Sequence, residues 1–475
     1  MQRRTLLRSA TLAALAVVPV GAAPTTSASA AEIPVSSLAE LQKAIDGAEA
    51  GDRIVVADGT YTVPSGGALS VSGKHGTSSA PITIVSRSRG GVVLKGERSF
   101  VLSNSSNITL SGFTFRQSTT LELPADCSAI RLTRNDFQLA DSGDPHWLVV
   151  RADDTKIDRN RFHGKTTAGV FLVVDGPGST AMAQNLHVFR NHFSDHTYGG
   201  TNGGEALRLG VSGRALSGAH AVVEYNLFER CDGDPEAVSV KSCDNTVRYN
   251  TVRDSRGGIV LRHGNRSTVQ GNHLLDGGEG IRLYGNDHRI VNNHVSGLSG
   301  RALVIGSGST RDHHAGETKD ERRGNDACDR ALIAHNSLIG NEETLSGETK
   351  PYEPQDVVVA DNLLVGDTGS LVAMGATSGF TWQSNLLWGA AANGNIPAGG
   401  FTRADPRLAA GADGVLRLTS ASPAIGAATL AGTPVTDDVD GDQRGSVRDI
   451  GADEYATAAP LRHPLTAADV GPNAP

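Results

Sequence analysis

The chain has 475 residues, of which 57 are glycine and only 4% are aromatic, and its formal net charge is −8. A charged fraction of 20% and a hydrophobic fraction of 38% exclude both a disordered chain and an integral membrane protein. Abundant glycine with few aromatic residues disfavours a helical bundle and favours short strands joined by turns. The acidic balance argues against nucleic-acid binding, so an anionic ligand would need a local basic groove.

Residues 1–30 have the features of a secretory signal peptide. A basic start is followed by a short apolar run over 12–20 and by Ala28-Ser29-Ala30, which fits a cleavage site. We therefore predict a secreted protein, and loss of the three arginines of this segment changes the charge to −11. The apolar run is too short to span a membrane. The Arg3-Arg4 pair also resembles a twin-arginine signal, which leaves export of the folded protein open.

The next segment predicts an amphipathic helix. Leu38, Leu41, Ala44 and Ile45 recur at helical spacing, and the helix is expected to begin near Ser36 or Ser37.

An internal repeat organises the chain that follows. Ten segments share an asparagine with an apolar residue three positions before it and another two positions after it. The shortest distances between successive asparagines, 21 to 26 residues, match the period of a stacked solenoid. The ten asparagines are Asn135, Asn160, Asn191, Asn226, Asn250, Asn272, Asn293, Asn336, Asn362 and Asn385.

Each copy predicts a short strand, a tight turn and another short strand, so stacked coils would join their strands into long parallel sheets. The predicted fold is all-β, a single-stranded right-handed parallel β-helix over residues 31–387 with the N-terminal helix as a cap on its open end. Asparagine tolerates the left-handed conformation of a sharp corner and can bond the asparagine of the next coil, which predicts a structural ladder.

Residues 388–475 lose the repeat and are predicted to form a C-terminal cap and an irregular tail. Within them, Asp438-x-Asp440-Gly441-Asp442 resembles part of a calcium loop. The later glutamate of such a loop is missing, so we expect a solvated acidic turn.

Three distances between asparagines exceed one coil and place insertions near residues 164–186, 196–220 and 306–328. Insertions in a solenoid emerge as loops on one face, which is often the binding face. The charged segment 310–330 is equally typical of a solvated loop and of the wall of a cleft.

Basic residues recur on equivalent strands of neighbouring coils. Side chains alternate along a strand, which directs Arg208, Lys241, Arg262 and Arg282 outward. Lys241 and Arg262 are 21 residues apart, or one coil, so we expect them on adjacent rungs of one outer face. Like charges stacked on adjacent rungs repel, which favours an anionic partner over mutual salt bridging on the sheet surface.

Oxygen-bearing side chains stand just before these strands. They are Asn202, Glu205, Asp234 and Glu236. Oxygen donors with no cysteine or paired-histidine motif suit Ca²⁺ rather than zinc.

Three segments in this region resemble polysaccharide lyase family six, whose members include alginate lyases and the dermatan-cleaving chondroitinase B. They are Asn202-Gly-Gly-Glu205, Glu236-x4-Lys241-Ser242 and Leu261-Arg262-His263-Gly264, and the resemblance runs from about Ile33 through Ser307. It implies calcium-assisted β-elimination on a uronic-acid polymer, with Lys241 as the base and Arg262 as the acid. It also implies that Asn202, Asp234 and Glu236 bind calcium, with Glu205 as an added ligand. The family generally has glutamate where this chain has the shorter Asp234.

This chemistry agrees with the residue types. Ca²⁺ beside the uronate carboxylate would stabilise the enolate, and Arg262 would add charge-assisted hydrogen bonds. Cationic neighbours favour the neutral amine of Lys241, as a base requires. A hydrolase would instead need two carboxylates flanking the bond, a pair that Asp234 and Glu236 could mimic.

Alginate is the expected substrate of a monomeric enzyme that binds an anionic polysaccharide and neither nucleic acid nor membrane. A lyase acting on dermatan sulfate and a non-catalytic carbohydrate-binding β-helix remain as alternatives.

Further side chains are candidates for binding substrate. Tyr284 stands one rung beyond Arg262 and is expected to stack on a sugar ring. His263 and His288 are also candidates, although His263 is expected to point inward or into the turn and His288 to be a loop histidine. Export permits disulfides, and Cys231 and Cys243, which bracket one strand, are the candidate pair.

Overall fold

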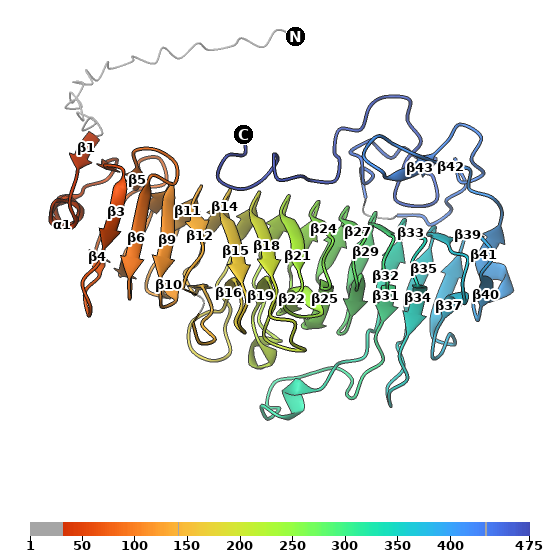
Figure 1. The fold of residues 1–475 in the computed structure, drawn as a ribbon. Helices are drawn as coiled ribbons and strands as arrows, with labels where there is room; N and C mark the ends of the chain where they lie inside the picture. Colours follow the sequence, from red (N-terminus) through yellow and green to blue (C-terminus); the bar gives the residue numbers. More distant parts are fainter. Residues whose placement is uncertain (1–31, 141, 433–434) are drawn as a thin grey trace, which may run out of the picture.

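The computed structural model describes residues 32–140, 142–432 and 435–475. The signal peptide predicted over 1–30 lies outside the described residues. The described chain is a parallel β-helix, whose coils stack side by side along one axis (Figure 1). Among the described residues, no helix combines the length and apolar character needed to cross a membrane.

The predicted N-terminal cap is confirmed. Helix α1 (Leu38–Gly47) covers the first coil, and Ser37 caps it by accepting the backbone N–H of Glu40 at 3.2 Å. The Glu40 carboxylate accepts the backbone N–H of Ser36 at 2.7 Å in return. The apolar face of α1 buries Leu41 and Ile45 against the end of the core, so the end of the solenoid is not left open.

Three long parallel sheets form the sides of the β-helix. The first contains β1 (Glu32–Val35), β2 (Arg53–Val56), β5 (Ile82–Ser86), β8 (Ile108–Ser111), β11 (Arg131–Thr133), β14 (Lys156–Asp158), β17 (His187–Phe189), β20 (Val222–Glu224), β23 (Thr246–Arg248), β26 (Thr268–Gln270), β29 (Arg289–Val291), β32 (Leu332–Ala334), β35 (Val357–Ala360) and β38 (Phe380–Gln383). The second contains β10 (Leu121–Leu123), β13 (Leu148–Val150), β16 (Leu172–Val174), β19 (Leu207–Leu209), β22 (Glu236–Lys241), β25 (Gly258–His263), β28 (Ile281–Leu283), β31 (Arg301–Ile305), β34 (Glu343–Gly347), β37 (Ser370–Ala373) and β40 (Ala392–Gly394). The third contains β3 (Gly59–Thr62), β6 (Val92–Gly96), β9 (Phe113–Gln117), β12 (Asp136–Phe137), β15 (Arg161–Lys165), β18 (His192–His196), β21 (Leu227–Cys231), β24 (Thr251–Arg253), β27 (His273–Leu275), β30 (His294–Ser296), β33 (Ser337–Ile339), β36 (Leu363–Val365), β39 (Asn385–Trp388) and β41 (Phe401–Arg403).

Short elements complete the structure. Strand β4 (Leu69–Ser72) pairs with β7 (Phe100–Ser103), and β42 (Leu408–Ala410) forms an antiparallel pair with β43 (Leu416–Leu418). Three 3-10 turns lie in loops: η1 (Ser212–Arg214), η2 (Glu321–Arg323) and η3 (Ala398–Gly400).

The predicted asparagine ladder is present and fully buried. From Asn135 to Asn385, each side-chain amide donates to the side-chain oxygen of the next asparagine at 2.9–3.0 Å. The expectation that these asparagines adopt the left-handed conformation is wrong. The residue before each asparagine adopts it instead, with φ between 51° and 61°, as at Arg134 and Tyr249. The asparagine is thereby free to turn its amide inward.

Aromatic side chains stack beneath this corner. The residues two positions after successive asparagines, Phe137, Phe162, Phe193 and Phe228, have ring centroids 4.5–5.0 Å apart and nearly parallel planes. That distance matches the separation of paired strands. The inward direction predicted for this position is therefore confirmed.

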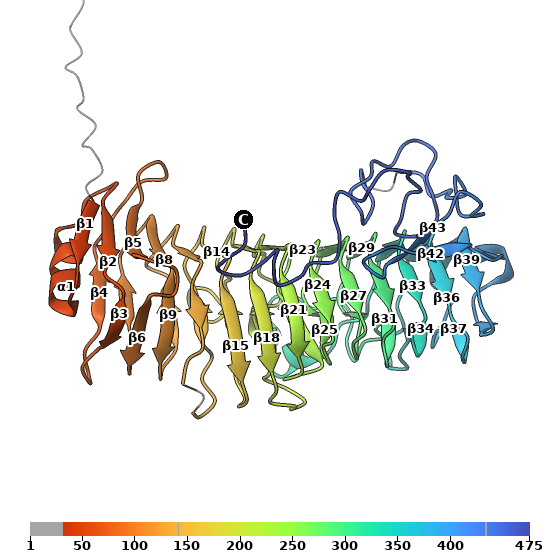
Figure 2. The same ribbon diagram turned by 45° about the horizontal axis from the view of Figure 1, so that its top comes forward.

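The coils continue beyond residue 387, where the sequence repeat was expected to end. Strands β40 and β41 extend the second and third sheets to Arg403. The residues after Arg403 fold back along the outside of the coils (Figures 1 and 2). Leu418 and Ile450 join Leu363 of β36 in one buried apolar cluster, and Leu465 donates its backbone N–H to Thr251 Oγ1 of β24 at 2.7 Å.

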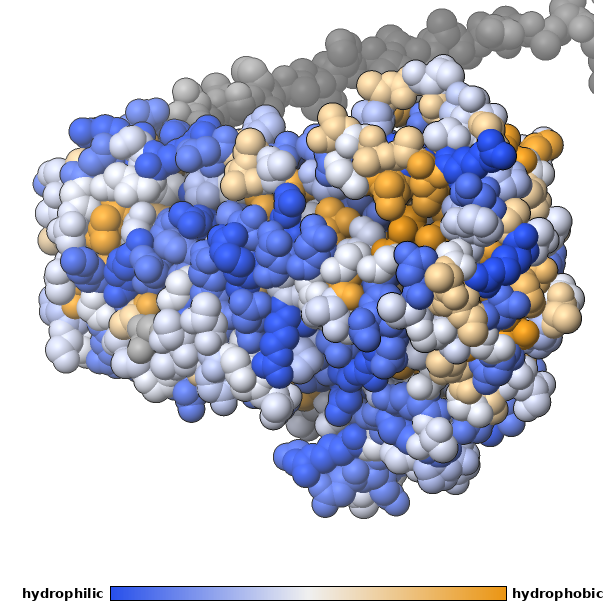
Figure 3. All heavy atoms as spheres, turned by 45° about the vertical axis from the view of Figure 1, so that its right-hand side comes forward, coloured by the Kyte–Doolittle hydropathy of each residue, from blue (hydrophilic) through white to orange (hydrophobic). Residues whose placement is uncertain are grey.

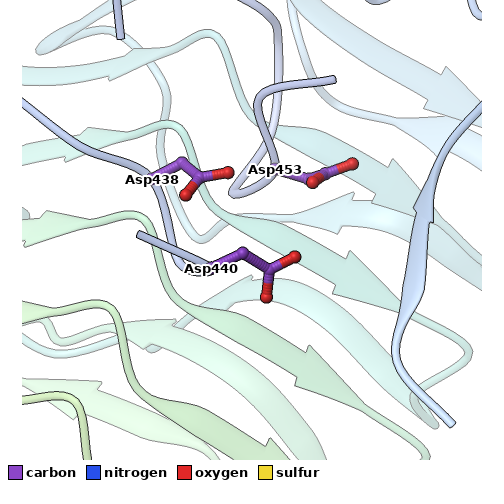
Figure 4. A group of neighbouring side chains, drawn as sticks. All are labelled: Asp438, Asp440 and Asp453. Atoms are coloured by element: carbon purple, nitrogen blue, oxygen red, sulfur yellow. The ribbon is translucent and has the colours of Figure 1, made fainter. Parts of the chain in front are cut away.

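An acidic cluster in this tail corrects the expectation of a solvated turn. Asp438, Asp440 and Asp453 converge (Figure 4), and each is at least nine-tenths buried. Their carboxylate oxygens lie within 4.8 Å of one another, and Arg417 donates to Asp440 at 2.9 Å. Burial, with the charges of neighbouring aspartates, raises the pKa of Asp453 to about 7.

The predicted disulfide is wrong. Cys231 and Cys243 are both buried and free, as are Cys127 and Cys328. Cys231 ends a strand of the third sheet, whereas Cys243 lies just after a strand of the second sheet.

Candidate active site

A polar cavity of about 640 Å³ lies over β22, β25 and β28 of the second sheet. Most of the predicted site residues line it, including all four basic residues and three of the four oxygen-bearing ones. They are Asn202, Arg208, Asp234, Glu236, Lys241, Arg262, His263 and Arg282. Residues from strands up to three coils apart therefore meet in one place.

The three insertions form the wall of a second cavity of about 1130 Å³. Its lining comes from residues 175–181, 211–217 and 315–323. It adjoins the first cavity, because Val211, Ser212 and Arg323 line both. The charged segment 310–330 thus serves as a cleft wall, and it is the lobe that projects below the body in Figure 3, where hydrophilic residues cover most of its surface.

Lys241 and Arg262 occupy the same cavity, but their pairing differs from the one predicted. Val240 pairs with Leu261, and Lys241 then pairs with His263, so Arg262 is the extra residue of a β-bulge. A bulge bends its strand and redirects a side chain. Arg262 is carried over the ring of Tyr284, 5.8 Å from the ring centroid.

The basic residues form two rows rather than one stripe. Arg208 is in register with Ser239, Val260 and Arg282 on successive strands, whereas Lys241 lies two residues further along its strand. Three of the four cations pair with carboxylates, although mutual salt bridging was expected to be the less favoured arrangement, and Arg208 makes the longest of these pairs, with Nη1 at 4.0 Å from Glu205 Oε2. Lys241 Nζ lies 3.1 Å from Glu205 Oε1, and Arg282 Nη2 lies 3.1 Å from Glu236 Oε1.

Arg262 is the exception among these cations. Its interaction among the described residues is with the Tyr284 ring, and it has no ion pair or hydrogen bond to any of them. A guanidinium in this state keeps its full donor capacity for a ligand.

The three acidic side chains influence one another. Burial, followed by the charges of Glu205 and Glu236, raises the pKa of Asp234 to about 6. Burial alone would raise the pKa of Glu205, but the adjacent Lys241 and Arg208 lower it. Glu205 Oε2 is buried without a hydrogen-bond partner. An orphaned carboxylate oxygen among oxygen donors fits the chemistry that Ca²⁺ requires.

The carboxylate oxygens of Glu205, Asp234 and Glu236 do not form a tight cluster in this structure. Among the described residues, Asp438, Asp440 and Asp453 are the acidic group whose oxygens lie within 4.8 Å of one another. The oxygens of Glu205, Asp234 and Glu236 are more widely spread, and each of these side chains already has a protein partner. Asn202 is exposed in the loop above them and lines the cavity.

Two of the side chains predicted to bind substrate, Tyr284 and His288, are buried away from the cavity. Tyr284 is only 1% exposed, and its hydroxyl donates to Glu348 at 2.7 Å, so the prediction that it stacks on a sugar is wrong. His288 is also 1% exposed and bonds backbone groups of Ser267 and Tyr284, so it does not line the cavity. His263 borders the cavity but is 4% exposed.

The environment of His263 also affects its charge. Burial, followed by the charges of Arg262 and Lys241, lowers its pKa to about 3. The imidazole is therefore neutral at ordinary pH, and its position matches the expected inward direction.

Two residues at the site were not identified from the sequence. Arg323 reaches the cavity from the third insertion, and its guanidinium pairs with Asp320 at 3.0 Å. His146 lies beside Arg208, with Nε2 at 3.3 Å from Nη2 of that arginine. The excess of charge in 310–330 was a signal for Arg323. No spacing in the sequence connects His146 to a residue 62 positions away.

Comparisons with known proteins identify the fold and the family of this chain. The family model of chondroitinase B matches residues 35–369. The solved structure of the family-six alginate lyase AlyGC is similar to this chain, with 27% identity and a TM-score of 0.73 over 82% of this chain. This chain spans 56% of the length of that protein.

Two further solved structures share the fold. A mannuronic-acid-specific family-six lyase from human gut microbiota has 23% identity and a TM-score of 0.67, covering 79% of this chain and 91% of its own. The alginate lyase AlyF-OU02 has 22% identity and a TM-score of 0.65, covering 83% of this chain and 92% of its own. A search of curated proteins found no match. By the extent of the family-model match, the chain belongs to the chondroitinase B family of polysaccharide lyases, polysaccharide lyase family six.

Proposed function

We propose that the protein is a secreted, monomeric alginate lyase that cleaves its polymer by β-elimination with the help of calcium. The observation that carries this proposal is the unpaired Arg262 guanidinium in one cavity with the Lys241 amine. A basic amine and a free cationic donor are the two groups that elimination from a uronate requires.

The proposed roles follow from position. Lys241 acts as the base that removes the proton from C5 of the uronate, and the electrons of that C–H bond form the C4–C5 double bond. The C4–O bond breaks, Arg262 stabilises the departing oxygen with hydrogen bonds, and the proton that Lys241 has taken is passed to that oxygen. The products are a new chain end and a 4,5-unsaturated sugar, so atoms and electrons balance.

Asn202, Glu205, Asp234 and Glu236 are the residues that would hold calcium. The bound ion supplies a Lewis acid that neutralises the uronate carboxylate. Glu205 has a second role in this proposal, since its carboxylate holds the Lys241 side chain in place at 3.1 Å. Arg282 positions Glu236 in the same way.

Alginate is favoured because the 27% identical AlyGC, similar over 82% of this chain, is named an alginate lyase. A dermatan sulfate lyase is the second candidate, because the matching family model is that of chondroitinase B.

The deciding experiment incubates the protein with alginate, dermatan sulfate and pectate and follows the ultraviolet absorbance of the unsaturated product. We expect product from alginate. Product from dermatan sulfate alone would make dermatan sulfate, rather than alginate, the substrate. Product from none of the three polymers would favour a non-catalytic binding protein.

A further inference from the structure

The N–H groups of His146 and Arg208 that face each other have no hydrogen-bond acceptor between them. The backbone N–H of Val170 donates to His146 Nδ1 at 3.0 Å, so this nitrogen carries the lone pair. In the neutral ring the proton is therefore on Nε2, which faces Arg208 Nη2 at 3.3 Å. Two N–H donors thus point at each other, and neither supplies an acceptor.

The state of each partner supports this assignment. Burial, followed by the charge of Arg208, lowers the pKa of His146 to about 4, which keeps the ring neutral at ordinary pH. The side chain of Arg208 is 14% exposed, and its Nε is buried without a hydrogen-bond partner. Its nearest carboxylate oxygen, Glu205 Oε2, is 4.0 Å away. Leaving buried donors without acceptors is costly, so such a site favours an added acceptor.

The fold aligns His146 with the cavity. Leu148, Leu172, Leu207 and Val238 are in register on β13, β16, β19 and β22. The residues two positions before them, His146, Val170, Glu205 and Glu236, consequently follow one edge of the second sheet. A polymer lying along this edge from the Lys241 cavity would pass Arg208, which lines that cavity, and reach His146.

We propose that His146 Nε2–H and the Arg208 guanidinium together bind the carboxylate of a uronate that neighbours the sugar undergoing elimination. A carboxylate oxygen accepts from both donors and removes their conflict, and the bonds to it are charge-assisted. His146 directly precedes β13, which is three coils before the Lys241 strand β22, so the carboxylate held between His146 and Arg208 belongs to a different sugar from the one that meets Lys241. This inference rests on the proposed function and adds a specificity residue to it.

Two substitutions separate this role from a purely structural one. His146→Gln places an amide N–H near the position of Nε2 and removes the acceptor for Val170. His146→Asn keeps an acceptor near the position of Nδ1 and removes the donor. If His146 binds substrate, His146→Asn and His146→Ala should raise KM for alginate about 10-fold with little change in kcat, and His146→Gln should restore most of the loss.

The opposite pattern would overturn the proposal. If His146→Asn behaves like the wild type while His146→Gln is impaired, the ring serves only to hold the Val170 backbone. Unchanged KM in all three variants would also overturn it, since a water molecule would then satisfy the two donors. Melting temperatures identify any variant that fails to fold.

A binding measurement tests the carboxylate directly. Alginate oligosaccharides and their carboxyl-reduced counterparts are titrated into Lys241→Ala protein and into the Lys241→Ala, His146→Asn double variant. The double variant should bind the natural oligosaccharide more weakly and the reduced one equally well. An equal loss for both ligands would contradict carboxylate recognition. If wild-type protein forms no product from any uronate polymer, the proposed function itself fails, and this outcome is distinct from the others.

Discussion

Lys241 pairs with His263 across β22 and β25, and the bulge that produces this pairing leaves Arg262 as the additional residue on its strand. His263 is buried and neutral behind the two cations. Arg262 is therefore displaced toward the cavity without a carboxylate to neutralise it, while Lys241 is fixed by Glu205. Because of the bulge, Lys241 is paired with a carboxylate, whereas the neighbouring Arg262 has no carboxylate partner among the described residues.

Lys241→Ala should lower kcat on alginate by about 10²- to 10⁴-fold, the range for loss of a general base. Lys241→Arg should be nearly as damaging, because arginine keeps its proton at neutral pH. Initial rates of ultraviolet absorbance measure both effects. The matched control is Lys156→Ala, which removes an exposed lysine from β14 of another sheet and should retain full activity. A wild-type rate for Lys241→Ala would place the base elsewhere.

Arg262→Ala should lower kcat to a similar degree, whereas Arg262→Lys should retain a fraction of the activity by keeping the charge without the planar fork. The fold should survive, because Arg262 makes no ion pair or hydrogen bond to the described residues. Circular dichroism and kinetics together check this expectation. Equal activity of Arg262→Ala and wild type would show that the departing oxygen needs no help from this residue.

Calcium binding should depend on the carboxylates of the cavity. Glu205→Gln should weaken Ca²⁺ binding by isothermal titration about 10-fold or more, since it removes the orphaned carboxylate oxygen. Asp234→Glu should bind calcium as well as or better than the wild type, and chelation should abolish elimination reversibly. Asp438→Asn, in the tail cluster, is the control for binding elsewhere, and it should leave the Ca²⁺ affinity of the cavity unchanged. Full activity after thorough chelation would remove calcium from the mechanism.

Asn250→Ala should destabilise the protein by about 2–4 kcal/mol, because it leaves buried polar partners unsatisfied in the ladder. Its side chain donates to Val223 O at 2.9 Å and Asn272 Oδ1 at 3.0 Å and accepts from Asn226. Chemical denaturation measures the loss. Asn473→Ala, at an exposed position in the tail, should cost about 0.5 kcal/mol or less. Similar effects of the two changes would refute a structural ladder.

The acidic cluster of the tail predicts a pH dependence of stability. The pKa of Asp453 is raised in the folded state to about 7, so the folded protein binds more protons than the unfolded chain between about pH 4 and pH 7. Stability from this group is therefore present at low pH and is lost as the pH rises through that window. Asp453→Asn keeps an acceptor for the Leu418 N–H and stays neutral.

Asp453→Asn should accordingly raise the melting temperature at pH 8 by a few degrees and change it little at pH 4. Asp413→Asn is the control of opposite sign, because hydrogen bonds from Arg417 lower the pKa of Asp413 to about 2. That variant should be destabilised at pH 8. A melting temperature of Asp453→Asn that falls at pH 8 would mean that the ionised carboxylate stabilises the fold, contrary to its raised pKa.

The solenoid could be predicted from the sequence because its signals are local and repeated. Each asparagine and its two apolar neighbours specify a strand, a corner and a strand without reference to distant residues. Alternation along β22, β25 and β28 likewise brought Lys241, Arg262 and Arg282 to one face. The bulge at Arg262 could not be predicted, because it depends on how two strands pair after they meet.

Contacts between distant segments were also beyond the sequence pattern. Tyr284 is withdrawn from the surface by Glu348, 64 residues later. The aspartates of the tail resemble a surface turn until Arg417 and the adjacent coils cover them. Periodicity determines which way a side chain leaves its strand, but the loops determine whether it reaches solvent.

The folded-back tail changes how the solenoid is expected to come apart. Stacked repeats touch only their neighbours, and such arrays open stepwise from either end. Here the tail donates the N–H of Leu465 to Thr251 and the N–H of Gly471 to the carbonyl of Arg190, while Ile450 belongs to the same buried cluster as Leu363. One strap thus joins coils that share no direct contact, so loss of the last coils also loosens those near the centre. We therefore expect the β-helix to unfold more cooperatively, and more slowly, than a solenoid whose ends open independently.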